Sequence, residues 1–146
     1  MNAKKRGPVV EVLLATHNGG RFLEAQLDSL LAQTYTDFTV VVSDDASTDG
    51  TPNMLEQYAR KHPGFLKILE PRENRLGACA NFARLLDLTQ ADYVFFCDQD
   101  DIWLPEKMAL TFERMQQIEA NSATATPALV HTDLMVVDEN LAVLGR

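Results

Sequence analysis

The chain has 146 residues, of which 46% are hydrophobic and 23% are charged. These values suit one globular domain over residues 1–146 and exclude a disordered or collagen-like chain. The formal net charge of −8 excludes a nucleic-acid partner, because binding to a phosphate backbone needs clustered Lys and Arg.

The first third of the chain predicts a strand, a helix and a second strand. The β-branched, apolar run over residues 9–15 predicts a buried strand that ends at the turn-forming Asn18-Gly19-Gly20. Leucines at helical spacing then predict a helix with one apolar face and with Glu24 and Asp28 in water. The leucines are Leu23, Leu27, Leu30 and Leu31. Residues 38–42 predict the next strand, followed by a polar turn over residues 43–50.

The middle of the chain repeats this alternation. Thr51 is the expected N-cap, and Pro52 the first-turn proline, of a helix that runs to about residue 61. A third strand is expected over residues 65–69. Gly77 precedes a helix that should end near Gln90, and residues 93–97 predict a fourth strand. The expected apolar face of the helix after Gly77 consists of Phe82, Leu85, Leu86 and Leu88.

The last third predicts a helix and two short strands. Pro105 should open the helix, and its apolar side consists of Leu104, Met108, Phe112, Met115 and Ile118. A loop over residues 121–127 separates it from strands at 129–130 and 134–137, and a turn is expected over residues 138–140.

Strands that alternate with helices predict an α/β fold, with a mainly parallel sheet flanked by helices. Ligands of such sheets bind beyond the carboxyl ends of the strands. Cys79 and Cys97 lie among apolar residues, so we expect two buried free thiols and a reducing compartment. The basic residues 1–8 lead into an apolar run too short for a signal peptide or a membrane span. We therefore expect a cytoplasmic protein, at most peripheral at the inner membrane.

Polar residues gather directly after three of the predicted strands. Each cluster alone could be a solvated turn, but three clusters at the same edge of a parallel sheet favour a shared ligand site. The clusters are Thr16-His17-Asn18, Asp44-Asp45 and Asp98-Gln99-Asp100-Asp101.

The third cluster holds three carboxylates in four residues. Such carboxylates repel one another unless a cation or hydrogen bonds compensate. One or two carboxylates together with substrate phosphates suit Mg²⁺ or Mn²⁺. We therefore expect a divalent ion that joins this acidic protein to a diphosphate and stabilises a departing phosphate.

Four stretches in order carry a likeness: LLATHNGGRFLEAQLDSLLAQTY, VVSDDASTDGT, NRLGACANF and FFCDQDDIWLPEK. With them the chain resembles family 2 glycosyltransferases, whose nucleotide-diphosphosugar fold is called GT-A, and within that family the bacterial rhamnosyltransferase-like members. The resemblance spans nearly the whole chain.

The resemblance implies roles for individual residues. Thr16, His17 and Asn18 match positions at the nucleotide, with His17 where the family commonly has a base-stacking tyrosine. Asp44 would accept a hydrogen bond from the base, with Asp45 supporting the loop.

The resemblance also implies that Arg75 contacts the base or the phosphates. Asp98 and Asp100 match the family's DxD motif, in which the first aspartate contacts ribose or metal and the second binds the metal. Trp103 would pack beside the sugar pocket.

The resemblance also implies a reaction in which an acceptor hydroxyl displaces the nucleotide from a UDP- or dTDP-sugar, with inversion at the anomeric carbon. A saccharide or lipid-linked acceptor in bacterial polysaccharide or O-antigen synthesis is expected. The base that takes the hydroxyl proton lies well downstream of the DxD motif in relatives, so we expect it beyond Arg146, with His131 and Asp133 as weaker candidates. A chain truncated in this way should expose apolar surface near its last strands and self-associate.

Three alternatives remain open. Asp45, Ser47, Asp49, Gly50 and Glu56 fit the spacing of a calcium loop, although that loop needs a helix before it. A nucleotidyltransferase would use a similar sheet and carboxylate-bound magnesium, with a glycine-rich basic loop of which Asn18-Gly19-Gly20-Arg21 is a poor version, since no lysine follows it. The third alternative is a nucleotide-binding module without the acceptor half and without turnover.

Overall fold

The computed structural model describes residues 7–121, 127–138 and 140–145. The chain forms two compact units, Met1–Pro105 and Glu106–Arg146. The single domain expected from the chain length stays a prediction. Most of the expected loop at 121–127, and Glu139 of the expected turn, lie outside the described residues.

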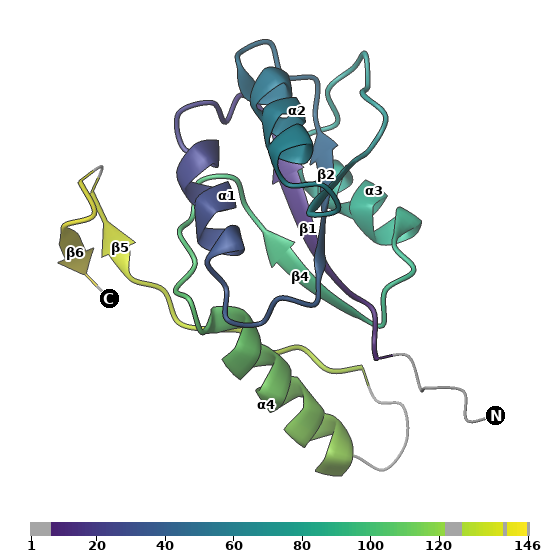
Figure 1. The fold of residues 1–146 in the computed structure, drawn as a ribbon, viewed down its shortest axis with the longest axis vertical. Helices are drawn as coiled ribbons and strands as arrows, with labels where there is room; N and C mark the ends of the chain where they lie inside the picture. The colour runs from purple at the N-terminus through teal and green to yellow at the C-terminus, as the bar shows by residue number, and fades with distance from the viewer. Residues whose placement is uncertain (1–6, 122–126, 139, 146) are drawn as a thin grey trace. The chain divides into compact units, whose positions relative to one another are not determined.

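The first unit is built on a parallel four-stranded sheet, as predicted (Figure 1). Its strands are β1 (Val10–Thr16), β2 (Thr39–Asp44), β3 (Leu66–Ile68) and β4 (Tyr93–Cys97). Their order across the sheet is β3-β2-β1-β4, so the chain's first strand occupies a central position. Because all four strands run in the same direction, their carboxyl ends meet at one edge, where the polar clusters follow.

Helices cover both faces of this sheet. Side chains alternate along a strand, and Leu13, Val41 and Leu85 of α3 (Ala78–Leu88) share one buried cluster. Leu14 therefore faces the other side, as does Cys97, its partner in β4. On that side the buried face of α1 (Leu23–Leu31) packs, because the amide of Gln26 donates to the Cys97 sulfur at 3.1 Å.

The helix α2 (Thr51–Lys61) lies beside α1, where the Tyr58 hydroxyl donates to Asp28 at 2.8 Å. Of the two expectations for the start of α2, one is confirmed and the other is wrong. Pro52 does lie in its first turn, but the N-cap is Gly50, and Thr51 is already helical. The Thr51 hydroxyl instead accepts a hydrogen bond from the Gly19 N–H at 2.9 Å, so it ties the loop after β1 to the start of α2.

The expected apolar face of α3 is partly wrong. Its buried residues are Asn81 and Leu85, whereas Leu86 and Leu88 are 43% and 51% exposed. The expectation of two buried thiols fails for Cys79, which is exposed, while Cys97 is buried. Successive helical residues are rotated by about 100°, which points Cys79 roughly 200° away from Asn81 and so away from the sheet.

The second unit contains α4 (Lys107–Asn121) and an antiparallel pair, β5 (Val136–Val137) and β6 (Val143–Gly145). The helix begins two residues after Pro105. The strand predicted at 129–130 is absent, since these described residues are irregular, and β6 was not predicted. The turn between β5 and β6 is closed by the Leu141 N–H, which donates to the Asp138 carbonyl at 3.0 Å.

Within the described parts of the chain, no helix combines the length and apolar character that crossing a membrane requires.

Candidate functional site

A cavity of about 250 Å³ opens at the carboxyl edge of the sheet, within the first unit. It brings together residues from the ends of β1, β2 and β4 and from the start of α3, which is where a parallel sheet is expected to bind a ligand. The lining residues are Ala15, Thr16, His17, Asp45, Arg75, Ala78, Asn81, Phe82, Asp98, Gln99 and Asp100.

His17 lines the cavity with a ring whose orientation is fixed. Its Nδ1 lies 2.8 Å from the Asp45 carbonyl oxygen. A carbonyl can only accept, so Nδ1 donates this hydrogen bond, and Nε2 lies 3.4 Å from the side-chain nitrogen of Asn18. The ring is thereby held at the edge of the cavity.

Asn18 forms hydrogen bonds with the loop after β2 and is not among the residues that line the cavity. Its N–H donates to the Ser47 hydroxyl at 2.8 Å, and its side-chain oxygen accepts from the Thr48 N–H at 2.8 Å. Its φ of 50° is left-handed, a conformation that Asn adopts more readily than most residues. Asn18 thus joins the loops that follow β1 and β2.

Asp44 and Asp45 are used differently from the roles that the resemblance implies. The Asp44 carboxylate accepts from the Thr16 hydroxyl at 2.7 Å and from both the N–H and the hydroxyl of Ser47. Asp44 is not among the lining residues, whereas Asp45 is. The geometry therefore gives Asp44 the loop-supporting role and brings Asp45 to the cavity.

Asp45 is 2% exposed and organises the segment that leads into α3. Its two carboxylate oxygens accept from the N–H groups of Leu76 at 2.6 Å and Gly77 at 2.7 Å. The Arg75 Nε lies 3.9 Å from the same carboxylate, and most of the Arg75 side chain remains exposed at the cavity. Arg75 therefore offers a positive charge beside an otherwise acidic site.

Asp98 and Asp100 line the same cavity, as a shared metal site requires. Partial burial raises the pKa of the Asp98 carboxyl, and the negative charges of Asp101 and Asp100 raise it further. No group of three or more His, Cys, Asp or Glu side chains within the described residues is arranged to hold a metal. Two carboxylates still fit a Mg²⁺ or Mn²⁺ ion whose remaining ligands are waters and substrate phosphates.

Five lining residues were given no role from the sequence: Ala15, Ala78, Asn81, Phe82 and Gln99. Asn81 is 2% exposed, and its amide donates to the Ser43 carbonyl at 2.8 Å and accepts from the Ser43 hydroxyl. A polar residue one helical turn before the buried Leu85 was the available signal. Gln99 was part of the third polar cluster but was given no role, because its hydrogen-bond partner is the main chain of His17, 82 residues away.

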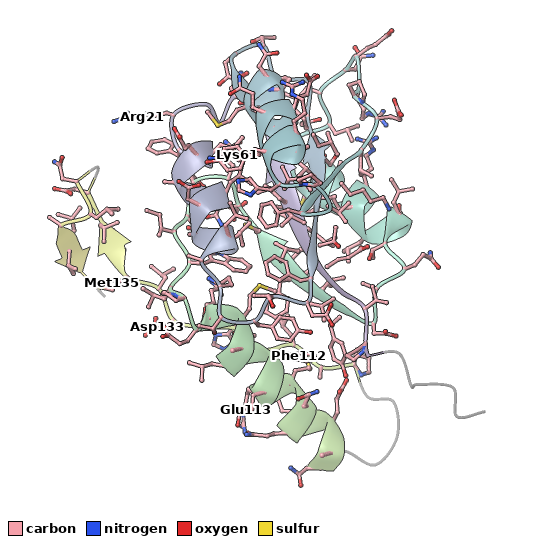
Figure 2. All side chains as sticks on the ribbon, in the orientation of Figure 1. Arg21, Lys61, Phe112, Glu113, Asp133 and Met135 are labelled. Atoms are coloured by element: carbon pink, nitrogen blue, oxygen red, sulfur yellow. The ribbon has the colours of Figure 1, made fainter. Side chains whose placement is uncertain are left out.

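Trp103, His131 and Asp133 were also expected near the site. Trp103 is 4% exposed, with its ring 6.1 Å from that of Phe95, and is not a lining residue. It packs in the core rather than beside the pocket. Figure 2 shows Asp133 in the segment that leads into β5. Asp133 and His131 belong to the second unit, and both are exposed.

The calcium-loop alternative is not supported. The segment before Asp45 is the strand β2 rather than a helix. Asp45 is bound to the N–H groups at the start of α3, and Asp49 accepts from the N–H groups of Gly20 and Thr51 at 3.0 and 2.9 Å. These carboxylates therefore point to different partners and do not form a ring of ligands.

The sequence matches the model of Glycosyl transferase family 2 over residues 11–133. A match of this extent, together with the sheet and the cavity described above, identifies the class of protein: the chain belongs to Glycosyl transferase family 2 and has the GT-A fold.

A curated relative is dTDP-rhamnosyl transferase RfbG of Shigella flexneri, 41% identical over 99 residues, or 65% of this chain and 34% of the relative. The structure of S. aureus TarS 1-349 with UDP superimposes with a TM-score of 0.66 at 28% identity, over 75% of this chain and 32% of that one.

A third similar protein is the mannosyltransferase PcManGT of Pyrobaculum calidifontis, solved with GDP-Man and Mn²⁺. It superimposes with a TM-score of 0.63 at 32% identity, and the match covers 73% of this chain and 31% of PcManGT. The chain thus spans about a third of the length of each of these three proteins.

Proposed function

We propose that this chain forms the nucleotide-sugar-binding part of a metal-assisted, inverting glycosyltransferase that takes a UDP- or dTDP-sugar as donor. The observation that carries the proposal is the common cavity of Asp98, Asp100 and Arg75 at the carboxyl edge of the sheet. Paired carboxylates suit a divalent ion, and an arginine beside them suits a phosphate. An acidic protein needs such local positive charge to hold a diphosphate.

The base-binding end of the cavity is formed by His17 and Asp45. The ring of His17 offers a flat surface, and the hydrogen bond from its Nδ1 to the Asp45 carbonyl holds its orientation. Each oxygen of the Asp45 carboxylate keeps a lone pair beyond the one that Leu76 or Gly77 uses. A pyrimidine N–H would donate to such an oxygen, so Asp45 takes the role that the sequence assigned to Asp44.

The metal end of the cavity is formed by Asp98 and Asp100. A divalent ion held there would supply Lewis-acid stabilisation of the departing diphosphate. The chain's own residues bind and orient: Asp98 and Asp100 hold the ion, and Arg75 draws the phosphates toward it. The similar mannosyltransferase PcManGT, which was solved with GDP-Man and Mn²⁺, supports the use of a divalent ion.

The acceptor is a saccharide or lipid-linked hydroxyl, in keeping with polysaccharide synthesis. The dTDP-rhamnosyl transferase RfbG and the putative teichuronic acid glycosyltransferase TuaG of Bacillus subtilis support this class of product. A lipid-linked acceptor would bring the protein to the inner membrane surface. Self-association is also part of the proposal, through apolar side chains such as Phe96 of the edge strand β4, which is 48% exposed.

Isothermal titration with UDP and dTDP, with and without Mn²⁺, tests the first step. We expect one of the two nucleotides to bind, with higher affinity when Mn²⁺ is present. Absence of binding for both nucleotides in the presence of Mn²⁺ would refute the proposal. Turnover of a UDP- or dTDP-sugar by the same preparation would then separate an enzyme from a binding module, while family membership already favours sugar transfer over nucleotidyl transfer.

The Asp100→Asn substitution tests the metal role. It removes a charge at nearly constant volume, so the gain in nucleotide affinity that Mn²⁺ produces should fall by about 100-fold. The melting temperature should stay within about 2 °C of the parent, because Asp100 is exposed and its carboxylate accepts no hydrogen bond from the described residues. Asp92→Asn is the matched control, since Asp92 lies before β4, at the opposite end of the strand. Parent-like Mn²⁺ dependence in Asp100→Asn would contradict the metal assignment.

A further inference from the structure

We propose that Gln99 is a positioning residue: its side-chain amide clamps the loop of Asp98 and Asp100 onto the main chain of His17, and so holds the two carboxylates together for a divalent ion. This inference rests on the proposed function, because it concerns the metal end of the same cavity. It assigns the glutamine a role in geometry and none in contact with the donor.

The clamp extends the sheet beyond its last backbone pair. The ladder between β1 and β4 ends at Leu14 and Cys97. Past this point, the His17 N–H donates to the Gln99 side-chain oxygen at 2.8 Å, and the Gln99 side-chain nitrogen donates to the His17 carbonyl at 3.0 Å. One carboxamide thus takes both hydrogen bonds that a neighbouring strand would supply. It links the two loops after their backbones have separated.

Gly19 leaves room for this clamp. A Cβ at Gly19 would collide with the carboxamide oxygen of Gln99 and would lie 2.6 Å from its carboxamide carbon. The φ of Gly19 is not among the positive values in the chain, so the backbone there would accept an alanine. The requirement for glycine at this position therefore comes from the close approach of the Gln99 side chain.

The clamp acts against a repulsion between neighbouring carboxylates. Asp98, Asp100 and Asp101 carry like charges, and among the described residues no hydrogen bond reaches the carboxylates of Asp98 or Asp100. Without a tether, the loop would relax so that these charges separate. Gln99 lies between Asp98 and Asp100 and fixes the main chain that carries both. A metal site loses affinity when the residues that orient its ligands are removed.

The chemistry of the clamp requires an amide. A primary amide offers a donor and an acceptor at once, and His17 presents one of each. A carboxylate would lose the bond to the His17 carbonyl and add a fourth negative charge. A thioether of similar length, as in Gln99→Met, would lose both bonds without adding charge. Gln99→Met is therefore the cleanest removal of the clamp.

The test compares two pairs of variants. Gln99→Met removes the clamp, and Gln33→Met is its control: Gln33 is 3% exposed, donates to the carbonyls of Ser29 and Leu104, and does not line the cavity. Gly19→Ala displaces the Gln99 side chain without changing its chemistry. Gly20→Ala is the control for it, because a Cβ at Gly20 would meet Asp49, at 2.9 Å, and not Gln99.

Two titrations are read for each variant: Mn²⁺ alone, and UDP or dTDP with and without Mn²⁺. We expect Gln99→Met and Gly19→Ala to lose about 10-fold to 100-fold in Mn²⁺ affinity and in the Mn²⁺-dependent gain in nucleotide affinity. Nucleotide affinity without Mn²⁺ should change by less than about threefold, because the base-binding groups remain. Melting curves of all four variants report whether each one folds.

The outcomes separate this inference from the proposed function. Parent-like Mn²⁺ affinity in folded Gln99→Met or Gly19→Ala would overturn the clamp and leave the nucleotide proposal standing. Equal losses in Gln33→Met or Gly20→Ala would also overturn it, since a general loss of stability would then explain the effect. If the parent binds Mn²⁺ but no nucleotide, the proposed function fails while the Mn²⁺ titration still decides the clamp. A parent that binds neither overturns both.

Discussion

The acidic loops after β2 and β4 lie at the same edge of the sheet, but their carboxylates differ in the hydrogen bonds that they accept. After β2, Asp44 accepts from Thr16 and Ser47, and Asp45 accepts from the N–H groups at the start of α3. After β4, the carboxylates of Asp98 and Asp100 receive no hydrogen bond from the described residues. The carboxylates after β2 thus accept hydrogen bonds within the fold, whereas those of Asp98 and Asp100 are left without such partners, as the proposed metal site requires.

The pKa values of two exposed aspartates express the same contrast. Hydrogen bonds from Thr51, side chain first, lower the pKa of Asp49, with a smaller contribution from the Gly20 N–H. Burial, followed by the charges of Asp101 and Asp100, raises the pKa of Asp98. A lowered pKa means that the folded state favours the ionised form, and a raised pKa means the reverse. Sequence motifs alone do not distinguish the two situations.

The largest expected effect comes from a substitution that removes hydrogen bonds of the loop after β2. Asp45→Ala should lower the free energy of unfolding by about 2–4 kcal/mol, because it leaves the N–H groups of Leu76 and Gly77 without acceptors next to a buried position. Urea denaturation measures this loss. Asp45→Asn is the control, since its one carbonyl oxygen can still accept and should restore part of the stability. A loss below about 0.5 kcal/mol in Asp45→Ala would show that the carboxylate does not organise this loop.

The next prediction concerns the loop after β4, where removal of a carboxylate should raise the stability of the fold instead of lowering it. In the absence of metal, Asp98→Asn should raise the melting temperature at pH 7 by a small amount, on the order of 1 °C, because solvent screens these exposed charges. The raised pKa means that the protonated carboxyl stabilises the fold at low pH, and that this stability is lost as the pH rises through the folded pKa. The difference between variant and parent should therefore shrink toward acidic pH.

The same Asp98→Asn variant should lose the Mn²⁺-dependent gain in nucleotide affinity, by about 10-fold or more. Greater stability together with weaker binding would mark a carboxylate that is kept for function. Melting curves in EDTA from pH 4 to 8 and a nucleotide titration with Mn²⁺ supply the two measurements. A variant that is less stable than the parent at pH 7 would place Asp98 with the structural aspartates.

The sheet could be predicted from the sequence because its signal is local. The apolar runs that became β1, β2 and β4 are flanked by turn residues, and their observed bounds differ from the prediction by at most two residues. The carboxyl-edge rule then places Thr16, Asp45 and Asp98 together without any contact information. This part of the site needed only the strand positions and the direction of the chain.

The roles within the site depend on distant contacts that the sequence does not reveal. Asp44 and Asp45 are adjacent and chemically identical, and their different partners, which include residues 28 to 32 positions away, decide which one reaches the cavity. Gln99 acquires its role from the main chain of His17, 82 residues away. The second unit was predicted least well, because β5 and β6 are two and three residues long and carry little periodicity.

The smallest expected effect is that of Asp49→Asn, which tests at acidic pH the contrast between the loops after β2 and β4. Asp49→Asn keeps an acceptor for Thr51 but removes the charge near the N-terminus of α2, so it should cost a few tenths of a kcal/mol at pH 7. The lowered pKa means that this stability is present above the unfolded value near 3.8 and is lost as the pH falls through the folded pKa. Urea denaturation of parent and variant at pH 7 and pH 3 should show a difference that is smaller at the lower pH. Asp98→Asn measured alongside should differ from the parent in the opposite direction at pH 7, and two variants that shift stability the same way would remove the distinction between these loops.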